Sequence, residues 1–189
     1  MILKNILFWQ PEKDWLKWMQ KNTFRQKNLI ILNYIIWVFF FYISYLLIKS
    51  DINIFWQILF ATIIAEFIER IVKKNVPWCR PMFNRNDTTP IGLVNSWYKT
   101  GSFPSGHTIK AVYFFLFILQ YQLFNPYVFL AIVLPLLTFR IIIGFHYPID
   151  MVGGIILGST VWLLSKGVVL PQNVNNIVQQ IFNFIFFIN

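Results

Sequence analysis

The chain has 189 residues, of which 57% are hydrophobic, 20% aromatic and only 12% charged, and its formal net charge is +9. Soluble domains carry about 25% charged residues, so this composition excludes an ordinary soluble globular protein and predicts a membrane protein. Cys79 is the only cysteine, which excludes a disulfide scaffold within one chain. The basic excess favours anionic lipid headgroups or phosphate as partners over nucleic acid, for which the chain carries no reading motif.

Five apolar segments approach the roughly 20 residues that a membrane-crossing helix needs. The first two are residues 29–48 and 52–72, and the second carries Glu66, Glu69 and Arg70 toward its end, where Glu66 and Arg70 can pair on one helix face. The other three segments follow a long polar stretch and lie at residues 107–123, 127–144 and 149–164. We therefore predict an all-α integral membrane bundle with about five transmembrane helices.

The two ends of the chain are predicted to form helices that lie along the membrane surface. After Pro11, lysines recur every four positions while tryptophans fall on another face, and the C-terminal segment alternates isoleucine and phenylalanine with asparagine and glutamine. Packing against neighbouring spans explains the C-terminal pattern equally well. We expect a single domain, residues 1–189, with an interfacial segment (1–27), a transmembrane core (28–168) and a C-terminal amphipathic segment (169–189).

Counting the membrane crossings places the reactive residues at one end of this bundle. With five spans, the polar stretch at residues 73–104 shares one face with the start of the third span, the end of the fourth and the start of the fifth. Both histidines of the chain lie on this face. The polar residues that it collects are Lys73, Arg80, Ser105, His107, Lys110, Arg140, His146 and Asp150.

The residues next to the two histidines favour binding of an anion and reaction of an imidazole with it. His146 and Asp150 are four residues apart at the start of the fifth span, so Asp150 can accept a hydrogen bond from one imidazole nitrogen and leave the other free to act. Ser105, Gly106 and His107 lead directly into the third span, whose first N–H groups attract an anion. An ordinary N-cap role is the alternative explanation for Ser105.

Three cations would meet the same anion. Lys73, Arg80 and Arg140 reach this face, and the planar guanidinium group suits phosphate oxygens. The alternatives are attraction of the basic loop to anionic lipid and, for Arg140, extension of its head toward the headgroups. No ligand set with convincing metal spacing is present on this face, so we expect neither a metal nor a cofactor. The pattern favours attack on phosphorus by one histidine, with the other protonating the leaving oxygen.

Three motifs resemble those of the type 2 phosphatidic acid phosphatase superfamily, integral membrane lipid phosphatases related to vanadium haloperoxidases. They are Lys73-x6-Arg80-Pro81, Pro104-Ser105-Gly106-His107 and Arg140-x5-His146-x3-Asp150.

The resemblance implies a role for each motif residue. His146 is the nucleophile that forms a phosphohistidine, Asp150 orients it, and His107 is the general acid and then the base for water. The phosphate is held by Lys73, Arg80, Ser105, Gly106 and Arg140. The chain departs from the family at Phe139, where the third motif usually has serine before its arginine, and this affects one phosphate hydrogen bond but not the chemistry.

A site at the membrane face implies a lipid phosphate or pyrophosphate as substrate. Small members with this layout resemble undecaprenyl pyrophosphate phosphatases, and we favour conversion of undecaprenyl pyrophosphate to undecaprenyl phosphate. Phosphatidylglycerophosphate, phosphatidic acid and lipid A stay open as substrates, as does transfer of the phosphate to a second lipid. The non-enzymatic alternative is a channel or transport protein, which does not require both histidines together with Asp150. The sequence does not indicate an oligomeric state.

Two arguments about the orientation of the chain in the membrane disagree. The predicted catalytic face carries 14 Lys and Arg residues and the opposite face two, Lys49 and Lys166, so the positive-inside rule puts the site in the cytoplasm. The resemblance implies a multi-pass protein of the cell (inner) membrane with an extracytoplasmic site, and an N-terminal helix lying on the membrane distorts the count. We therefore expect the extracytoplasmic orientation, against the charge count.

Overall fold

The computed structural model describes residues 2–12, 14–15, 18, 21–76, 78–81 and 101–186. Within these ranges the chain forms seven helices and no strands, so the all-α prediction is confirmed. The helices are α1 (Ile2–Leu7), α3 (Thr23–Ser50), α4 (Asn53–Asn75), α5 (Gly106–Tyr121), α6 (Pro126–Ile142), α7 (Pro148–Ser165) and α8 (Gln172–Phe186).

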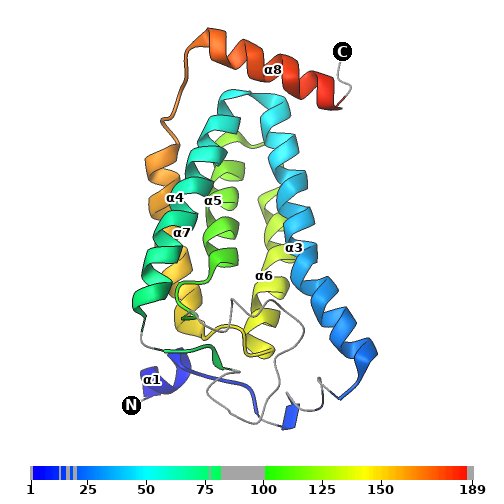
Figure 1. Cartoon of the computed structure of the whole chain (residues 1–189), viewed down its shortest axis with the longest axis vertical. Coiled ribbons are helices and arrows are strands. Elements are labelled where there is room, and N and C mark those ends of the chain that lie inside the picture. Colours follow the sequence, from blue (N-terminus) through cyan, green and yellow to red (C-terminus); the bar gives the residue numbers. More distant parts are fainter. Residues whose placement is uncertain are drawn as a thin grey trace.

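Helices α3 to α7 run up and down in a bundle, while α8 crosses one end of it and α1 lies at the other (Figure 1). Helix α5 is central, because it contacts α3, α4, α6 and α7. Buried side chains of α3, α4, α5 and α6, with Val161 of α7, form one continuous apolar core. From α3 to α7, each helix runs antiparallel to the one before it, so the end of α4 and the starts of α5 and α7 meet at the α1 end (Figure 1).

The helix boundaries follow from local chemistry between the predicted apolar segments. The side chain of Asn125 caps α6, accepting hydrogen bonds from the N–H groups of Tyr127 (2.9 Å) and Val128 (3.3 Å), as an N-cap asparagine does. After α6, Gly144 has a φ of 76°, a conformation that glycine adopts without steric cost. Pro148 then occupies the first position of α7, where its missing N–H group is not needed.

Helices α5 and α7 approach each other closely because glycines line their interface. A Cβ atom on Gly154 would lie 2.6 Å from the Thr108 Cβ, and one on Gly158 would lie 2.6 Å from the Ile109 carbonyl oxygen. Both distances are too short for a side chain, so the glycines set how near the two helices come. This packing brings the second and third sequence motifs together.

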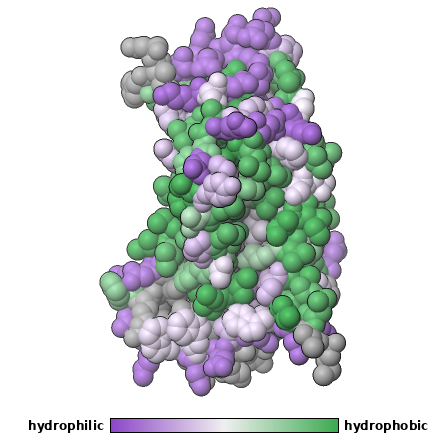
Figure 2. All heavy atoms as spheres, turned by 180° about the vertical axis from the view of Figure 1, so that it is seen from behind, coloured by the Kyte–Doolittle hydropathy of each residue, from purple (hydrophilic) through white to green (hydrophobic). Residues whose placement is uncertain are grey.

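Apolar side chains cover the sides of the bundle. Figure 2 shows hydrophobic residues over the middle of one face and hydrophilic residues toward its two ends. By length and composition, only one of the described helices, Pro148–Ser165, passes as a membrane span, and Tyr34–Ser50 and Pro126–Ile142 are shorter apolar stretches. The transmembrane nature of the bundle therefore stays a prediction.

The two ends of the chain are described to different extents. The predicted surface helix after Pro11 falls largely outside the described residues. At the other end, α8 is held by Asn175, which donates to the Asn53 Oδ1 (2.8 Å) and accepts from the Trp56 Nε1 (2.8 Å). Phe182 packs against Tyr45, yet the apolar side chains of Ile177, Ile181, Phe184 and Ile185 are exposed. One side of α8 thus packs on the bundle and another presents apolar groups outward.

Candidate active site

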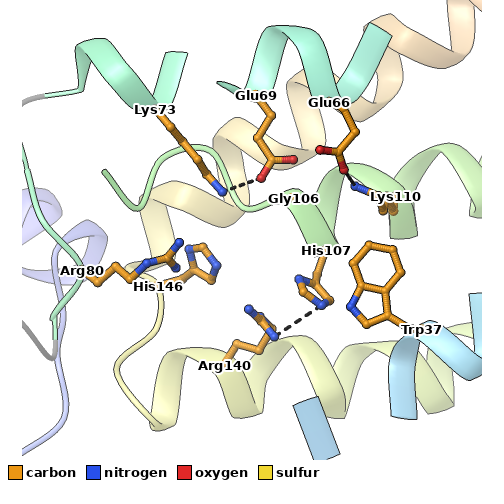
Figure 3. A pocket seen from close by; sticks show the side chains of 10 residues that line it. All are labelled: Trp37, Glu66, Glu69, Lys73, Arg80, Gly106, His107, Lys110, Arg140 and His146. Atoms are coloured by element: carbon orange, nitrogen blue, oxygen red, sulfur yellow. Dashed lines mark hydrogen bonds and ion pairs between the residues drawn. The ribbon is translucent and has the colours of Figure 1, made fainter. Parts of the chain in front are cut away.

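A cavity of about 190 Å³ lies at the α1 end of the bundle, where the predicted catalytic face was placed. Its walls come from α3, α4, α5 and α6, from the segment that holds Arg80 and from the α6–α7 connection that holds His146 (Figure 3). The lining residues are Trp37, Glu66, Glu69, Lys73, Arg80, Gly106, His107, Lys110, Arg140 and His146.

Six of the eight predicted site residues line this cavity: Lys73, Arg80, Gly106, His107, Arg140 and His146. The other two, Ser105 and Asp150, are fully buried behind it. Residues spread over almost 80 positions therefore meet in one place, with two of them supporting the wall from outside.

His146 is held by the start of α7. Its Nδ1 lies 3.3 Å from the Asp150 Oδ2, and the same oxygen accepts a hydrogen bond from the Tyr147 N–H (2.8 Å). Because Asp150 positions the ring through Nδ1, the Nε2 atom is not needed for this and can act on a substrate. The expected pairing of His146 with Asp150 is thus present, with the carboxylate fixed by the backbone that it caps.

Burial lowers the pKa of the His146 imidazole well below its usual value of 6.5, and the charges of Arg80, Arg140 and Lys73 lower it further. Taking an imidazolium out of water among several cations is unfavourable, so the ring is neutral at pH 7. A neutral ring has a lone pair on one nitrogen. This is the protonation state that a nucleophile requires.

Ser105 acts as the N-cap of α5. Its Oγ accepts from the Thr108 N–H (3.5 Å) and the Thr108 hydroxyl (3.0 Å), while its own N–H donates to the Asp150 carbonyl oxygen (3.0 Å). The N-cap interpretation of Ser105 is confirmed. The backbone bond also ties the second motif directly to the third.

The cations converge on the space between the histidines. Arg80 is buried and donates to the Phe145 carbonyl oxygen at 3.1 Å. A guanidinium nitrogen of Arg140 lies 3.5 Å from the His107 Nε2. Lys73 extends from the last turn of α4 and pairs with Glu69. A cavity lined by these groups and by the start of α5 suits a compact anion.

Glu69 is a site residue that motif reasoning missed. Its carboxylate lies against Gly106 so closely that any side chain at that position would collide with it. It therefore sits at the start of α5, where the helix attracts negative charge. A charged residue inside an otherwise apolar span was the signal that could have identified it.

Glu66, Lys110 and Trp37 form a second group that the motifs do not include. Glu66 accepts from the Lys110 Nζ at 2.7 Å, and its other oxygen lies 4.0 Å from Arg70, so the predicted pair of Glu66 with Arg70 is present. The Trp37 ring packs against His107, with 5.0 Å between ring centroids. Nothing in the sequence distinguishes Trp37 from the other aromatic residues of its helix.

A family model described as the PAP2 superfamily matches residues 54–173, which include all three motifs and more than half of the chain. Neither the curated proteins nor the solved structures gave a match. PAP2 denotes the type 2 phosphatidic acid phosphatases that the motifs resemble, and its members are generally phosphatase-type hydrolases of lipid or related phosphates. From the motifs and the match together, the chain belongs to the PAP2 superfamily.

Proposed function

We propose that this chain is an integral membrane lipid phosphatase that hydrolyses undecaprenyl pyrophosphate to undecaprenyl phosphate and inorganic phosphate. The observation that carries the proposal is the cavity in which two histidines face three motif cations, with Asp150 fixing one of the histidines. Membership of the PAP2 superfamily supports a phosphatase of lipid or related phosphates. The lipid itself is our inference from the apolar surface of the bundle and from the family resemblance.

The reaction begins when the Nε2 of His146 attacks the terminal phosphorus. A bond forms between this nitrogen and phosphorus, and the bond from phosphorus to the leaving oxygen breaks. Arg80, Arg140 and Lys73 stabilise the negative charge on the remaining phosphoryl oxygens. The negative charge of the bound phosphate favours the protonated form of His107, which gives its proton to the leaving oxygen and becomes neutral.

The second step hydrolyses the phosphohistidine. His107 now takes a proton from a water molecule, whose oxygen attacks phosphorus while the phosphorus–nitrogen bond breaks. Inorganic phosphate leaves and His146 is again neutral. No step requires a metal ion. Because Lys73 is paired with Glu69, the entering phosphate competes with this carboxylate for the Lys73 ammonium group.

The same proposal places the bundle in the cell membrane, with α3 to α7 crossing it. The hydrophobic middle of the surface in Figure 2 and the exposed apolar side chains of α3 and α8 support this placement. The cavity then opens near the headgroups, where the phosphate of a lipid lies. We assign this end to the extracytoplasmic side, as the family resemblance implies.

The experiment measures phosphate release by the detergent-purified protein in the presence of EDTA. Undecaprenyl pyrophosphate, phosphatidylglycerophosphate, phosphatidic acid and lipid A are compared as substrates. We expect fastest release from undecaprenyl pyrophosphate, and at least about a thousand-fold loss in His146→Asn because the nucleophile is gone. A folded wild-type protein that releases no phosphate, or a His146→Asn variant as active as the wild type, would contradict the phosphatase. If the phosphate were found on a second lipid, the protein would be a phosphotransferase and not a hydrolase.

A further inference from the structure

Lys110 is a buried cation in the cavity that the reaction described above does not use. It lies one turn after His107 on α5 and is almost completely removed from solvent. Its Nζ donates to the Glu66 Oε1 at 2.7 Å and lies 5.1 Å from the centre of the Trp37 ring. Burying an ammonium group is costly, and Lys110 lies outside all three motifs.

The position of Lys110 relative to the two histidines indicates what it could bind. In Figure 3, Arg80 and His146 occupy one side of the cavity, Trp37 and Lys110 occupy the other, and His107 lies between them. The Trp37 ring contacts His107 as well as Lys110, so these two α5 side chains share one wall. A group that leaves from phosphorus toward His107 therefore moves toward Lys110.

We propose that Lys110 forms a second phosphate subsite, which binds the phosphate retained by the leaving group when the substrate is a lipid diphosphate. The inference rests on the proposed phosphatase function and defines its substrate class. His146 attacks the terminal phosphorus, the bridging oxygen departs with the lipid monophosphate and takes a proton from His107, and Lys110 pairs with the oxygens of that monophosphate. A lipid monoester has no second phosphate to place there.

Glu66 is compatible with this role because it keeps another partner. Its side chain is 42% exposed, and the Arg70 side chain, 80% exposed, lies 4.0 Å from its second oxygen. When a phosphate pairs with the Lys110 ammonium group in place of Glu66, the Glu66 carboxylate stays close to Arg70 and to water. An alternative role for the Lys110–Glu66 ion pair is simply to join α4 to α5, and the test must separate the two roles.

The test compares farnesyl pyrophosphate with farnesyl phosphate, which carry the same chain and differ by one phosphate. In Lys110→Met we expect kcat/KM for the diphosphate to fall about tenfold or more, as for a lost charged contact, while kcat/KM for the monophosphate stays within about threefold. Lys110→Arg should keep the preference for the diphosphate. Lys166→Met, at the opposite end of the bundle, serves as the matched lysine control.

Glu66→Gln separates binding from a structural role because it breaks the same ion pair and leaves Lys110 in place. The subsite predicts that Glu66→Gln retains the preference for the diphosphate, whereas a structural pair predicts that both variants lose activity equally on both substrates. Equal losses in Lys110→Met, or no loss at all, would overturn the subsite while leaving the phosphatase intact. If the wild type released no phosphate from either substrate, the proposed function itself would fail.

Discussion

At the scale of single residues, the short connection between α6 and α7 places His146 for its proposed role as the nucleophile. The turn at Gly144 and the first turn of α7 place the imidazole between Asp150 on one side and the cations of the cavity on the other. Asp150 has no contact with the cavity itself, since it is buried behind His146 and caps α7. The carboxylate therefore positions the ring without adding negative charge where phosphate binds.

The lowered pKa of His146 predicts how stability depends on pH. Burial and the neighbouring cations keep the folded-state pKa well below 6.5, so the unfolded chain binds a proton on this side chain more readily than the folded chain does. The free energy of unfolding contributed by this group is thus unaffected above its ordinary pKa and falls as the pH drops below it. Thermal unfolding midpoints in detergent at about pH 7.5 and about pH 5.5 measure the effect.

His146→Asn should remove this contribution. We expect the drop in unfolding midpoint between the two pH values to be smaller in His146→Asn than in the wild type, because asparagine does not titrate. The titratable groups that do not contact His146 are common to both proteins and contribute equally to both drops. An equal drop in both proteins would show that His146 binds a proton equally well in the folded and unfolded chains.

At the scale of elements, the contact between α5 and α7 aligns the proposed catalytic groups. Helix α5 carries His107 and is capped by Ser105, while α7 begins beside His146 and carries Asp150 in its first turn. The hydrogen bond from the Ser105 N–H to the Asp150 carbonyl oxygen joins these two helix starts. The distance between the helices therefore sets the distance between His107 and His146, the proposed general acid and nucleophile.

Gly154→Ala tests this dependence. The added methyl group would lie 2.6 Å from the Thr108 Cβ and 3.0 Å from the Ser105 carbonyl oxygen, so α7 must move away from α5. We expect a loss of about 1–3 kcal/mol in stability together with slower phosphate release. Gly167→Ala is the matched control, because a Cβ at that position meets nothing within 4 Å. Thermal unfolding and phosphate assays on both variants give the result, and wild-type behaviour of Gly154→Ala would show that the interface tolerates separation.

The positions of the helices could be predicted from the sequence because their causes are local. The apolar segments of the sequence predicted five long helices, and α3 to α7 lie at those segments. The side of each helix that faces the cavity could not be predicted, since these helices are apolar on their outer sides as well. Trp37 lines the cavity and its neighbour Val38 does not, although hydropathy treats both as ordinary span residues.

The motif residues could be predicted to converge because the number of crossings determines which ends meet. That argument reached Lys73, Arg80, His107, Arg140 and His146 together. It could not reveal that Ser105 and Asp150 support the cavity from behind, because their burial depends on how α5 packs against α7. It also left the pairing of Lys110 with Glu66 open, since that contact joins two different helices.

At the scale of the whole molecule, the two ends of the bundle differ in the basic residues that they carry. The end with the cavity collects Lys73, Arg80 and Arg140, whereas Lys49 and Lys166 lie at the α8 end. These three cations line the proposed phosphate site. Their presence at this end can therefore have a cause other than the orientation of the chain in the membrane. This weakens the positive-inside argument, but removing the three proposed phosphate-binding cations from the count still leaves an excess of basic residues on the predicted catalytic face.

Cys79 offers a direct measurement of orientation. It is the only cysteine of the chain, it is exposed, and it precedes Arg80 at the cavity end. If that end is extracytoplasmic, a membrane-impermeant maleimide should label Cys79 in intact cells whose outer layers admit the reagent. The double variant Cys79→Ser/Gly167→Cys moves the thiol to the α8 end and should be labelled only after the cells are opened. If the double variant were labelled in intact cells and Cys79 only in opened cells, the cavity would lie in the cytoplasm. That result would favour the charge count over the family resemblance. Labelling of both positions in intact cells with a sealed inner membrane would contradict a bundle that crosses it.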